Sequence, residues 1–332
     1  MTQLTRRNLL GSAVAASAAT ALSPFGIAPA QAAAPPVGKQ APGFYRYKVG
    51  SIEVTAVTDG LRPTALADNF VRNASKEALH AAVAAGYEDP TKASFPFTPI
   101  VVNTGPKLVV IDTGLGPATF QQSKGALGQF QTNLAASGID PKAVDIVIIS
   151  HFHGDHINGL VGADNKPLFE NAEVMVPAPE WSFWMDDGNL SRAPEAMKGA
   201  FNNARRVFGA LGNKVTRYEG GKELTPGISS VATPGHTPGH TSYVISSGSA
   251  TVMVQVDVTA GPALLFVRNP DWQAAFDVDG PKAVETRRKL YDQVVADKML
   301  LQGFHFPFPS VGRLEKDGAG YRWVPAPWNP TI

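Results

Sequence analysis

The 332-residue sequence contains no cysteine. This absence excludes disulfides, thiolate zinc sites, iron–sulfur clusters and cysteine nucleophiles. Net charge is also nearly absent, since 29 basic residues face 28 acidic ones. So small a positive charge argues against nucleic-acid binding, which depends on basic surface that displaces counterions. Beyond the N-terminal segment, no apolar run approaches the roughly 20 residues that span a bilayer. What is present is a globular composition, 44% hydrophobic and 17% charged, with seven histidines.

The first 32 residues have the features of an export signal. Arg6 and Arg7 precede an alanine-rich apolar stretch, which ends in the small-residue segment Ala-Gln-Ala at 30–32. The arginine pair followed by Asn-Leu-Leu resembles a twin-arginine signal, which exports folded proteins. Glycine, serine, threonine and proline dilute the apolar stretch, which disfavours a permanent membrane anchor. We therefore expect a periplasmic or secreted mature protein that is not inserted in a membrane and carries 27 basic against 28 acidic residues.

Strand-like and helix-like patterns interleave along the rest of the chain. Residues 33–50 are rich in proline and glycine and are expected to form an extended arm, followed by one domain over 51–332. The interleaving favours an α/β domain in which two sheets pack together with helices outside. The segment 61–97 has few strand signals and is expected to form a flap. Expected strands cover 51–59, 100–103, 108–112, 144–150, 173–176, 215–218, 228–232, 241–246, 251–256 and 299–301, and expected helices cover 118–137, 180–186, 193–211 and 279–297.

The densest histidine cluster is the hexapeptide His-Phe-His-Gly-Asp-His at 151–156, directly after a buried strand-like run. Three imidazoles and a carboxylate so close together cannot all point one way on a strand or a helix. They can converge from a tight loop, and Gly154 permits the sharp backbone that such a loop needs. Neutral imidazole and carboxylate are the metal ligands available to a chain without cysteine. We therefore favour a metal site over a polar loop that is merely rich in histidine.

Three later positions extend this pattern. His236 lies in a loop that proline and glycine stiffen, and the same loop carries His240. Asp257 and His305 each follow the end of an expected strand. A single acid or histidine at a strand end is more often structural, so the evidence for a metal centre lies in the ordered set.

The ordered set resembles the metallo-β-lactamase-fold hydrolase superfamily, and the resemblance extends over roughly residues 50–310. The tripeptide Asp-Thr-Gly at 112–114 is also similar to the early Asp-x-Gly of that family. The resemblance implies a four-layer αββα sandwich. Within the superfamily, the segments 276–279, 286–288 and 303–309 look most like the exported methyl parathion hydrolase branch. That branch includes phosphotriesterases and relatives that act on lactones and aryl esters.

The same resemblance implies two divalent metal ions per chain. Asp257 is expected to bridge the two ions, and Asp155 is expected both to bind metal and to transfer protons, so these two are the expected catalytic residues. Asp112 is expected to orient a ligand imidazole and His240 to support the site, whereas His80 is expected at the surface. The first ion is expected on His151, His153 and His236, and the second on Asp155, His156 and His305.

One position departs from the family pattern. The family usually has glycine before the bridging aspartate, whereas this chain has Val256. A side chain there crowds the turn, so Val256 bears on the bridging geometry and on the occupancy of the second metal site.

The implied function is that of a dinuclear metal-dependent hydrolase, in which a metal-bound hydroxide attacks a carbonyl or phosphoryl centre. Nitrogen and oxygen ligands suit zinc best, with iron, manganese and cobalt as alternatives. A small neutral or apolar substrate is expected, namely a lactone, an aryl ester or an organophosphate triester, because aromatic residues flank the ligand loops. These residues are Phe95, Phe97, Phe152, Trp181, Phe183, Trp184, Phe304, Phe306 and Phe308.

Other functions stay open at this point. A β-lactamase or an acyl-homoserine lactonase would use the same ligands. A redox member of the fold would hold two irons and normally has an attached flavin domain. A non-enzymatic binding module is the third alternative, and Val256 is the feature that supports it. Relatives often dimerise, so a homodimer is an expectation by analogy.

Overall fold

The computed structural model describes residues 36–38, 40–259 and 263–332. The export signal expected at 1–32 lies outside these residues. The chain divides into a unit over Met1–Ala41 and a unit over Pro42–Ile332, and the second unit carries every helix and strand described below. Among the described residues, no helix combines the length and the apolar character that a membrane crossing requires.

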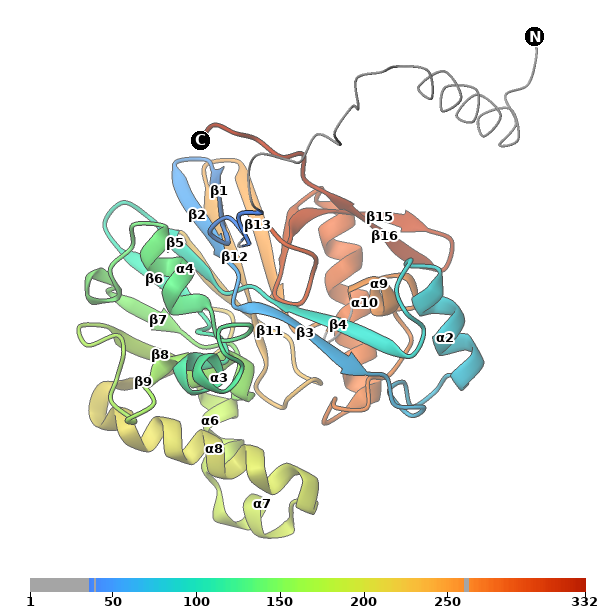
Figure 1. The fold of residues 1–332 in the computed structure, drawn as a ribbon, viewed down its shortest axis with the longest axis horizontal. Helices are drawn as coiled ribbons and strands as arrows, with labels where there is room; N and C mark the ends of the chain where they lie inside the picture. Colours follow the sequence, from blue (N-terminus) through green and yellow to red (C-terminus); the bar gives the residue numbers. More distant parts are fainter. Residues whose placement is uncertain (1–35, 39, 260–262) are drawn as a thin grey trace, which may run out of the picture. The chain divides into compact units, whose positions relative to one another are not determined.

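The first of two large sheets has seven strands in the order β1-β2-β5-β6-β7-β8-β9 (Figure 1). Its strands are antiparallel from β1 to β6 and parallel from β6 to β9. The parallel part matters for the site, because the carboxyl ends of its strands meet at one edge. The bounds are Phe44–Val49, Ile52–Val57, Ile100–Asn103, Leu108–Ile111, Ile146–Ile148, Glu173–Pro177 and Val215–Tyr218.

The second sheet also has seven strands, in the simple order β10 to β16. Its neighbours are antiparallel except for the parallel pair β13 and β14. The bounds are Glu223–Thr225, Ile228–Ala232, Thr241–Ser247, Ala250–Val256, Leu300–Gly303, Val311–Asp317 and Gly320–Pro325.

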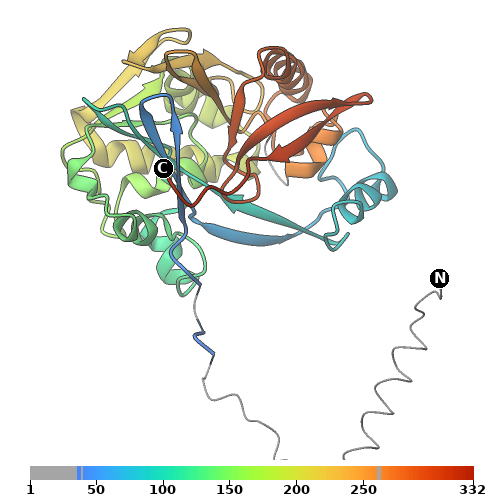
Figure 2. The same cartoon turned by 90° about the horizontal axis from the view of Figure 1, so that it is seen from above.

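Helices flank the two sheets (Figure 2). Their bounds are Lys76–Ala84 (α2), Gly116–Gln122 (α3), Phe130–Ala136 (α4), Gly154–Ile157 (α5), Ala178–Met185 (α6), Asp187–Arg192 (α7), Glu195–Leu211 (α8), Ala263–Arg268 (α9) and Gly280–Ala296 (α10). The N-cap of α10 is Asp279, since its side chain accepts from the backbone N–H of Lys282.

Three buried apolar clusters correspond to the three interfaces of four layers. The inner cluster joins the sheets and includes Val109 of the first and Val254 of the second. An outer cluster includes Val110 of the first sheet and Phe208 of α8, and the other includes Leu301 of the second sheet. Val109 and Val110 face opposite sides because successive residues of a strand alternate. This arrangement confirms the four-layer αββα metallo-β-lactamase fold.

The domain begins earlier than the sequence predicts. Residues 44–49, expected within an extended arm, form the edge strand β1, which pairs with β2 along its whole length. The boundary therefore lies near Pro42 rather than at 51. Aromatic and basic side chains make β1 half-buried and hide its strand pattern.

A single helix over 118–137 is also wrong. The structure has two short helices, α3 and α4, with a turn between them. Gly125 and Gly128 in this turn have φ values of 86° and 71°, which a continuing helix does not allow. A Cβ on Gly128 would lie 2.5 Å from the carbonyl oxygen of Gly116, so this turn requires glycine.

The segment expected to be a flap contains a small sheet of its own. Strands β3 (Gly60–Ala65) and β4 (Lys92–Phe97) pair antiparallel, with α2 between them in the chain. Figure 1 shows this two-stranded sheet crossing in front of the larger ones. The hairpin β15–β16 was not predicted either.

Candidate metal centre

The predicted ligands lie on loops that leave the ends of strands. The segment 151–156 follows β7, and His236 lies between β11 and β12. Asp257 directly follows β13, and His305 lies two residues after β14. Since β13 and β14 are parallel neighbours with Val256 opposite Gly303, Asp257 and His305 emerge side by side.

Three imidazoles, His151, His153 and His236, converge on one point, and we call them the first-metal group. The Nδ1 of His153 lies 3.0 Å from the Nε2 of His151 and 2.9 Å from the Nε2 of His236. All three nitrogens fall within 4.8 Å of one another, a spacing that suits a shared ion.

The second-metal group consists of Asp155, His156 and His305. An oxygen of Asp155 lies 3.6 Å from the Nε2 of His156 and 3.5 Å from the Nε2 of His305. These atoms also fall within 4.8 Å of one another. The structure therefore brings together the second set of expected ligands.

Asp257 lies between the two groups. One of its oxygens is 3.4 Å from the Nε2 of His236 and 3.2 Å from the Nε2 of His305. The other oxygen is 3.5 Å from the Nε2 of His156. This is the position that a bridging carboxylate requires.

Three of these histidines donate their Nδ1 protons to groups outside the centre, an arrangement that suits the binding of cations within it. His236 donates its Nδ1–H to Asp277, His156 to Asp112, and His305 to the carbonyl oxygen of Pro96, at 2.9, 2.8 and 2.9 Å. Ionised carboxylates and carbonyls only accept, so in the neutral form of each imidazole the Nε2 presents a lone pair to the centre.

One of these lone pairs has no donor among the described residues. The buried Nε2 of His156 and Oδ1 of Asp257 have no hydrogen-bond partner among the described residues. Burial lowers the pKa of His153 to about 3 and holds the pKa of His151 well below its usual value, so both stay neutral. Neutral imidazoles and carboxylates that face one another form the donor set of divalent ions. The cluster is therefore able to hold two such ions.

His240 is not a ligand, in agreement with the prediction that it supports the site. Its Nδ1–H donates to the carbonyl oxygen of Thr233 at 3.1 Å, and its Nε2 accepts the backbone N–H of Asp257 at 3.1 Å. Both nitrogens are therefore occupied. Burial lowers the pKa of His240 to about 3, which keeps the imidazole in this neutral form.

Asp112 orients His156, as predicted. It is fully buried, and its two oxygens accept from the backbone N–H and the hydroxyl of Ser150 at 2.9 and 2.7 Å. These bonds hold the carboxylate between the neighbouring strands β6 and β7. The backbone of Asp112 has a φ of 59°, which directs the side chain toward the site.

Asp277 plays the same part for His236, and the sequence reasoning missed it. The residue lies in the segment 276–279, which carried part of the family resemblance but received no role. The guanidinium of the buried Arg287 lies 3.9 Å from Asp277 and donates to the carbonyl oxygen of Val258 at 2.9 Å. A helix residue thus supports both a ligand-orienting carboxylate and the loop after Asp257.

Glu180 is a second residue that the sequence reasoning missed. It is fully buried at the start of α6 and accepts four hydrogen bonds. The donors are the backbone N–H of Phe152 (3.0 Å), the indole N–H of Trp184 (2.6 Å), the hydroxyl of Thr237 (2.9 Å) and the backbone N–H of Gly239 (2.8 Å). Burial raises the pKa of this carboxyl, although the four donors act against that rise. The sequence did carry a signal for Glu180, because it is an acidic residue within the apolar and aromatic segment Ala178–Met185.

Val256 adopts the conformation that glycine would favour. Its φ is 53°, which is rare for a β-branched residue, and the strand register shifts at this point. The side chain is buried in the inner cluster. Asp257 nevertheless reaches the centre, so the valine does not displace it.

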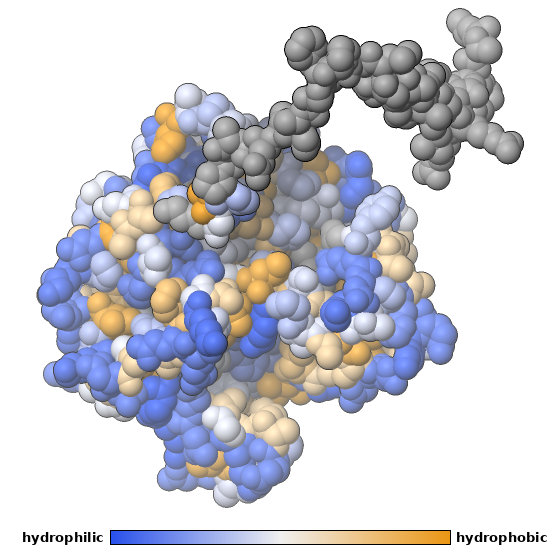
Figure 3. Space-filling view, in the orientation of Figure 1, coloured by the Kyte–Doolittle hydropathy of each residue, from blue (hydrophilic) through white to orange (hydrophobic). Residues whose placement is uncertain are grey.

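A cavity of about 330 Å³ opens over the ligands. The flap contributes Arg62 and Phe95, which lie opposite each other on β3 and β4, and Phe276 lines the cavity from the loop before α10. Figure 3 shows a recess bordered by apolar side chains on the face seen in Figure 1. Of the nine aromatic residues expected near the site, only Phe95 lines this cavity, whereas Phe152, Trp184 and Phe306 are fully buried.

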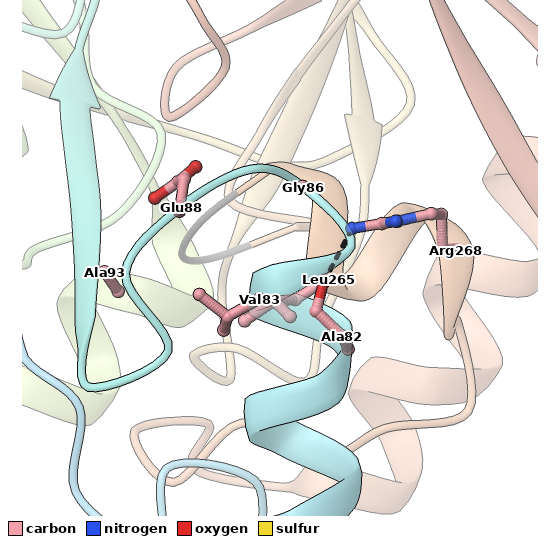
Figure 4. A pocket seen from close by; sticks show the side chains of 7 residues that line it. All are labelled: Ala82, Val83, Gly86, Glu88, Ala93, Leu265 and Arg268. Carbon is pink, nitrogen blue, oxygen red and sulfur yellow. Dashed lines mark hydrogen bonds between the residues drawn. The ribbon is translucent and has the colours of Figure 1, made fainter.

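A second hollow lies between α2 and α9, lined by Val83 and Leu265 among others (Figure 4). Arg268 beside it donates to the carbonyl oxygen of Ala82 at 2.9 Å. Its volume of about 10 Å³ leaves room for about one water molecule. It is a packing defect and offers no space for a substrate.

Comparison with known proteins agrees with this architecture. Residues 98–258 match the metallo-beta-lactamase superfamily. Curated N-acyl homoserine lactonases from a Bacillus species and from Bacillus thuringiensis subsp. kurstaki are 28% and 29% identical over 168 residues. These alignments cover 48% of this chain and 59% of the relatives, so the chain spans less than two thirds of their length.

Two solved structures are similar over most of the chain. AidC, a dizinc quorum-quenching lactonase in complex with the product N-hexanoyl-L-homoserine, has a TM-score of 0.79 and 26% identity, covering 86% of this chain and 98% of its own. The hydrolase AbOPH of the beta lactamase superfamily has a TM-score of 0.78 and 27% identity, covering 88% and 100%. The likeness to the methyl parathion hydrolase branch stays a prediction, as does the homodimer.

Proposed function

Residues 98–258 match the metallo-beta-lactamase superfamily, and from this premise we propose that the chain is a metal-dependent hydrolase of lactones. The observation that carries the proposal is the arrangement of two ligand groups around Asp257 beneath one cavity. The relatives named above support lactones over the other expected substrates, because several of them are lactonases. Zinc is the proposed metal, since AidC is described as a dizinc enzyme.

The proposed chemistry uses the residues as follows. Two divalent ions at these ligands would supply Lewis acidity, lowering the pKa of a shared water and polarising the carbonyl of the substrate. His236 and His156 are held in one tautomer by Asp277 and Asp112, so their lone pairs stay directed at the centre. The side chain of Asp155 is 20% accessible, and in this proposal it carries a proton to the leaving oxygen.

The cavity supports a neutral substrate. Phe95 and Phe276 provide apolar walls, while Arg62 is the one cationic side chain among its lining residues. An apolar wall reduces water near the scissile bond, and a single guanidinium can donate hydrogen bonds to the carbonyl oxygen of an acyl group. Such a lining suits a lactone with a hydrocarbon tail.

The proposal is tested with protein reconstituted with zinc. The panel contains N-hexanoyl-homoserine lactone, dihydrocoumarin, 4-nitrophenyl acetate, methyl parathion and a chromogenic cephalosporin. We expect the highest kcat/KM on a lactone, loss of that activity on chelation and its return with zinc. A protein that binds two zinc ions and cleaves none of the lactones would contradict the proposal, and preference for methyl parathion would favour a phosphotriesterase.

We also propose that residues 1–32 direct export through the twin-arginine route. The arginine pair and the small residues at 30–32 support this. Replacing Arg6 and Arg7 by lysine should leave the full-length precursor in the cytoplasm. Cell fractionation that finds the variant exported and processed as before would contradict the proposal.

A further inference from the structure

We propose that Glu180 is a positioning residue that couples the two histidine loops and thereby sets the affinity of the first metal site. The inference rests on the proposed metal-dependent function. Among the described residues, Glu180 forms no hydrogen bond to a ligand side chain, and its four donors are Phe152, Trp184, Thr237 and Gly239.

The donors come from both loops. One oxygen of Glu180 accepts from Phe152, which stands between His151 and His153, and the other accepts from Thr237 and Gly239, which follow His236. The two loops belong to different sheets, since one follows β7 and the other precedes β12. The carboxylate of Glu180 therefore joins the two loops that carry the ligands of the first-metal group.

The close approach of the His236 loop to the helix α6 independently supports this role of Glu180. A Cβ added to Gly239 would lie 2.2 Å from the backbone nitrogen of Glu180, so the loop approaches the first turn of α6 as closely as glycine permits. The ring of Trp184, which donates to Glu180, lies 6.0 Å from the ring of His153. Loop, helix and ligand thus form one packed unit.

Only a carboxylate satisfies this set of donors. Glutamine has the same shape, but its amide nitrogen would face two donors in place of one acceptor oxygen. The hydroxyl of Thr237 can rotate to accept, whereas the backbone N–H groups of Phe152 and Gly239 cannot. An unpaired N–H at a buried position is costly, so one loop would withdraw from the helix.

Withdrawal of one loop affects the two metal groups unequally. The first-metal group takes ligands from both loops, namely His151 and His153 from one and His236 from the other. The second-metal group takes none from the loop of His236. Glu180 therefore controls the first site more than the second.

The test uses the full-length protein and its Glu180→Gln variant, each stripped of metal before titration, with Glu173→Gln as a matched control. Glu173 lies in the adjacent strand β8 and is exposed. Zinc titration by calorimetry gives the two affinities, and cadmium-113 resonances assign them, since nitrogen-rich and oxygen-rich ligand sets differ in chemical shift. We expect a loss of about 10–100-fold at the first site of Glu180→Gln and a change of less than about threefold at the second.

Equal affinities in Glu180→Gln and wild type would overturn the inference, and so would an equal loss at both sites in a folded variant. If Glu180→Gln does not fold, Thr237→Val removes one donor without changing volume, and a smaller loss confined to the first site is expected. No loss in Thr237→Val would then overturn the inference. Wild type that binds two ions but cleaves no lactone refutes the proposed function alone, because metal binding is measured without substrate.

Discussion

The two metal groups differ in the residues that hold their ligand histidines in place. In the second-metal group, His156 is oriented by Asp112, which is itself held by Ser150 just after the neighbouring strand β7 of the same sheet. In the first-metal group, His236 is oriented by Asp277, which has the cation of Arg287 beside it at 3.9 Å. The first support is a neutral residue, Ser150, on the next strand connection of the same sheet, and we call it the local support. The second support is a cation, Arg287, which comes from the helix α10.

The two metal groups therefore depend on different parts of the fold. The local support needs only that β6 and β7 pair in register, as they do with Ile111 opposite Ile148. The other support needs α10, the loop before it and the second sheet to pack together. We therefore expect the first-metal group to be the more sensitive to changes far from the ligands.

The largest effect is expected where the groups meet. Asp257→Asn keeps the shape of the bridging residue but removes its charge, so both ions lose a ligand and the repulsion between them is no longer compensated. Lactone hydrolysis should fall by more than the ~100-fold that loss of a supporting residue costs, with release of metal measured by elemental analysis. Asp164→Asn at an exposed turn is the control and should behave as wild type. Full zinc content in Asp257→Asn would contradict the bridging position.

A direct comparison of Asp112→Asn with Asp277→Asn comes next. Each amide can present its nitrogen to the imidazole and favour the wrong tautomer, so each should weaken its own site by about 10–100-fold. Asp112→Asn should affect the second site and Asp277→Asn the first, as followed by cadmium-113 resonances. If both variants lost the same site, the division into two groups would be wrong.

The contrast also explains what could be predicted from the sequence. The ligands could be predicted because four of them fall in one hexapeptide after an apolar strand, and because the ordered set of histidines and aspartates resembles a known family. Asp112 could be predicted because it follows an apolar strand and belongs to the Asp-Thr-Gly tripeptide that resembles the family pattern. Asp277 and Glu180 could not be predicted in this way, because Glu180 lies within the helix α6 and Asp277 in the loop before α10, and neither local position indicates that it meets Gly239 or His236 after folding.

The errors in the fold have similar causes. Strand β1 carries Arg46 and Lys48 and pairs on one side only, so its apolar alternation is weak. The break between α3 and α4 had a signal in Gly125 and Gly128, but the helical pattern on either side outweighed it. Local pattern therefore predicted the central strands well and the edges and turns poorly.

The pH dependence of metal-free protein should separate the groups. The pKa of His153 is lowered to about 3 by burial, so between pH 6.5 and 3 the unfolded chain binds a proton that the folded chain does not. Stability then falls as the pH falls. The pKa of His305 is raised, and although burial opposes the rise, Asp257 and Asp155 outweigh it. Its contribution is present below pH 6.5 and is lost as the pH rises.

Urea unfolding of metal-free variants measures how the free energy of unfolding changes with pH, and so tests whether the contributions of His153 and His305 have opposite signs. Relative to wild type, His153→Gln should remove a slope of up to about 1.4 kcal/mol per pH unit between pH 6.5 and 5. His305→Gln should change the slope only above pH 6.5, and in the opposite direction. The same sign of change in both variants would contradict the electrostatic difference between the groups.

The smallest effect concerns the turn that both groups share at Asp257. Val256 and Val254 are both buried in the inner cluster, but only Val256 has a positive φ, of 53°. Replacement by glycine removes a similar apolar contact at either position, and at 256 it also relieves a conformation that costs about 1–2 kcal/mol. Val256→Gly should therefore lower the free energy of unfolding by about 1–2 kcal/mol less than Val254→Gly does. Equal losses in urea unfolding would show that the turn is relaxed with valine, in which case the glycine of the family pattern serves close packing and not backbone conformation.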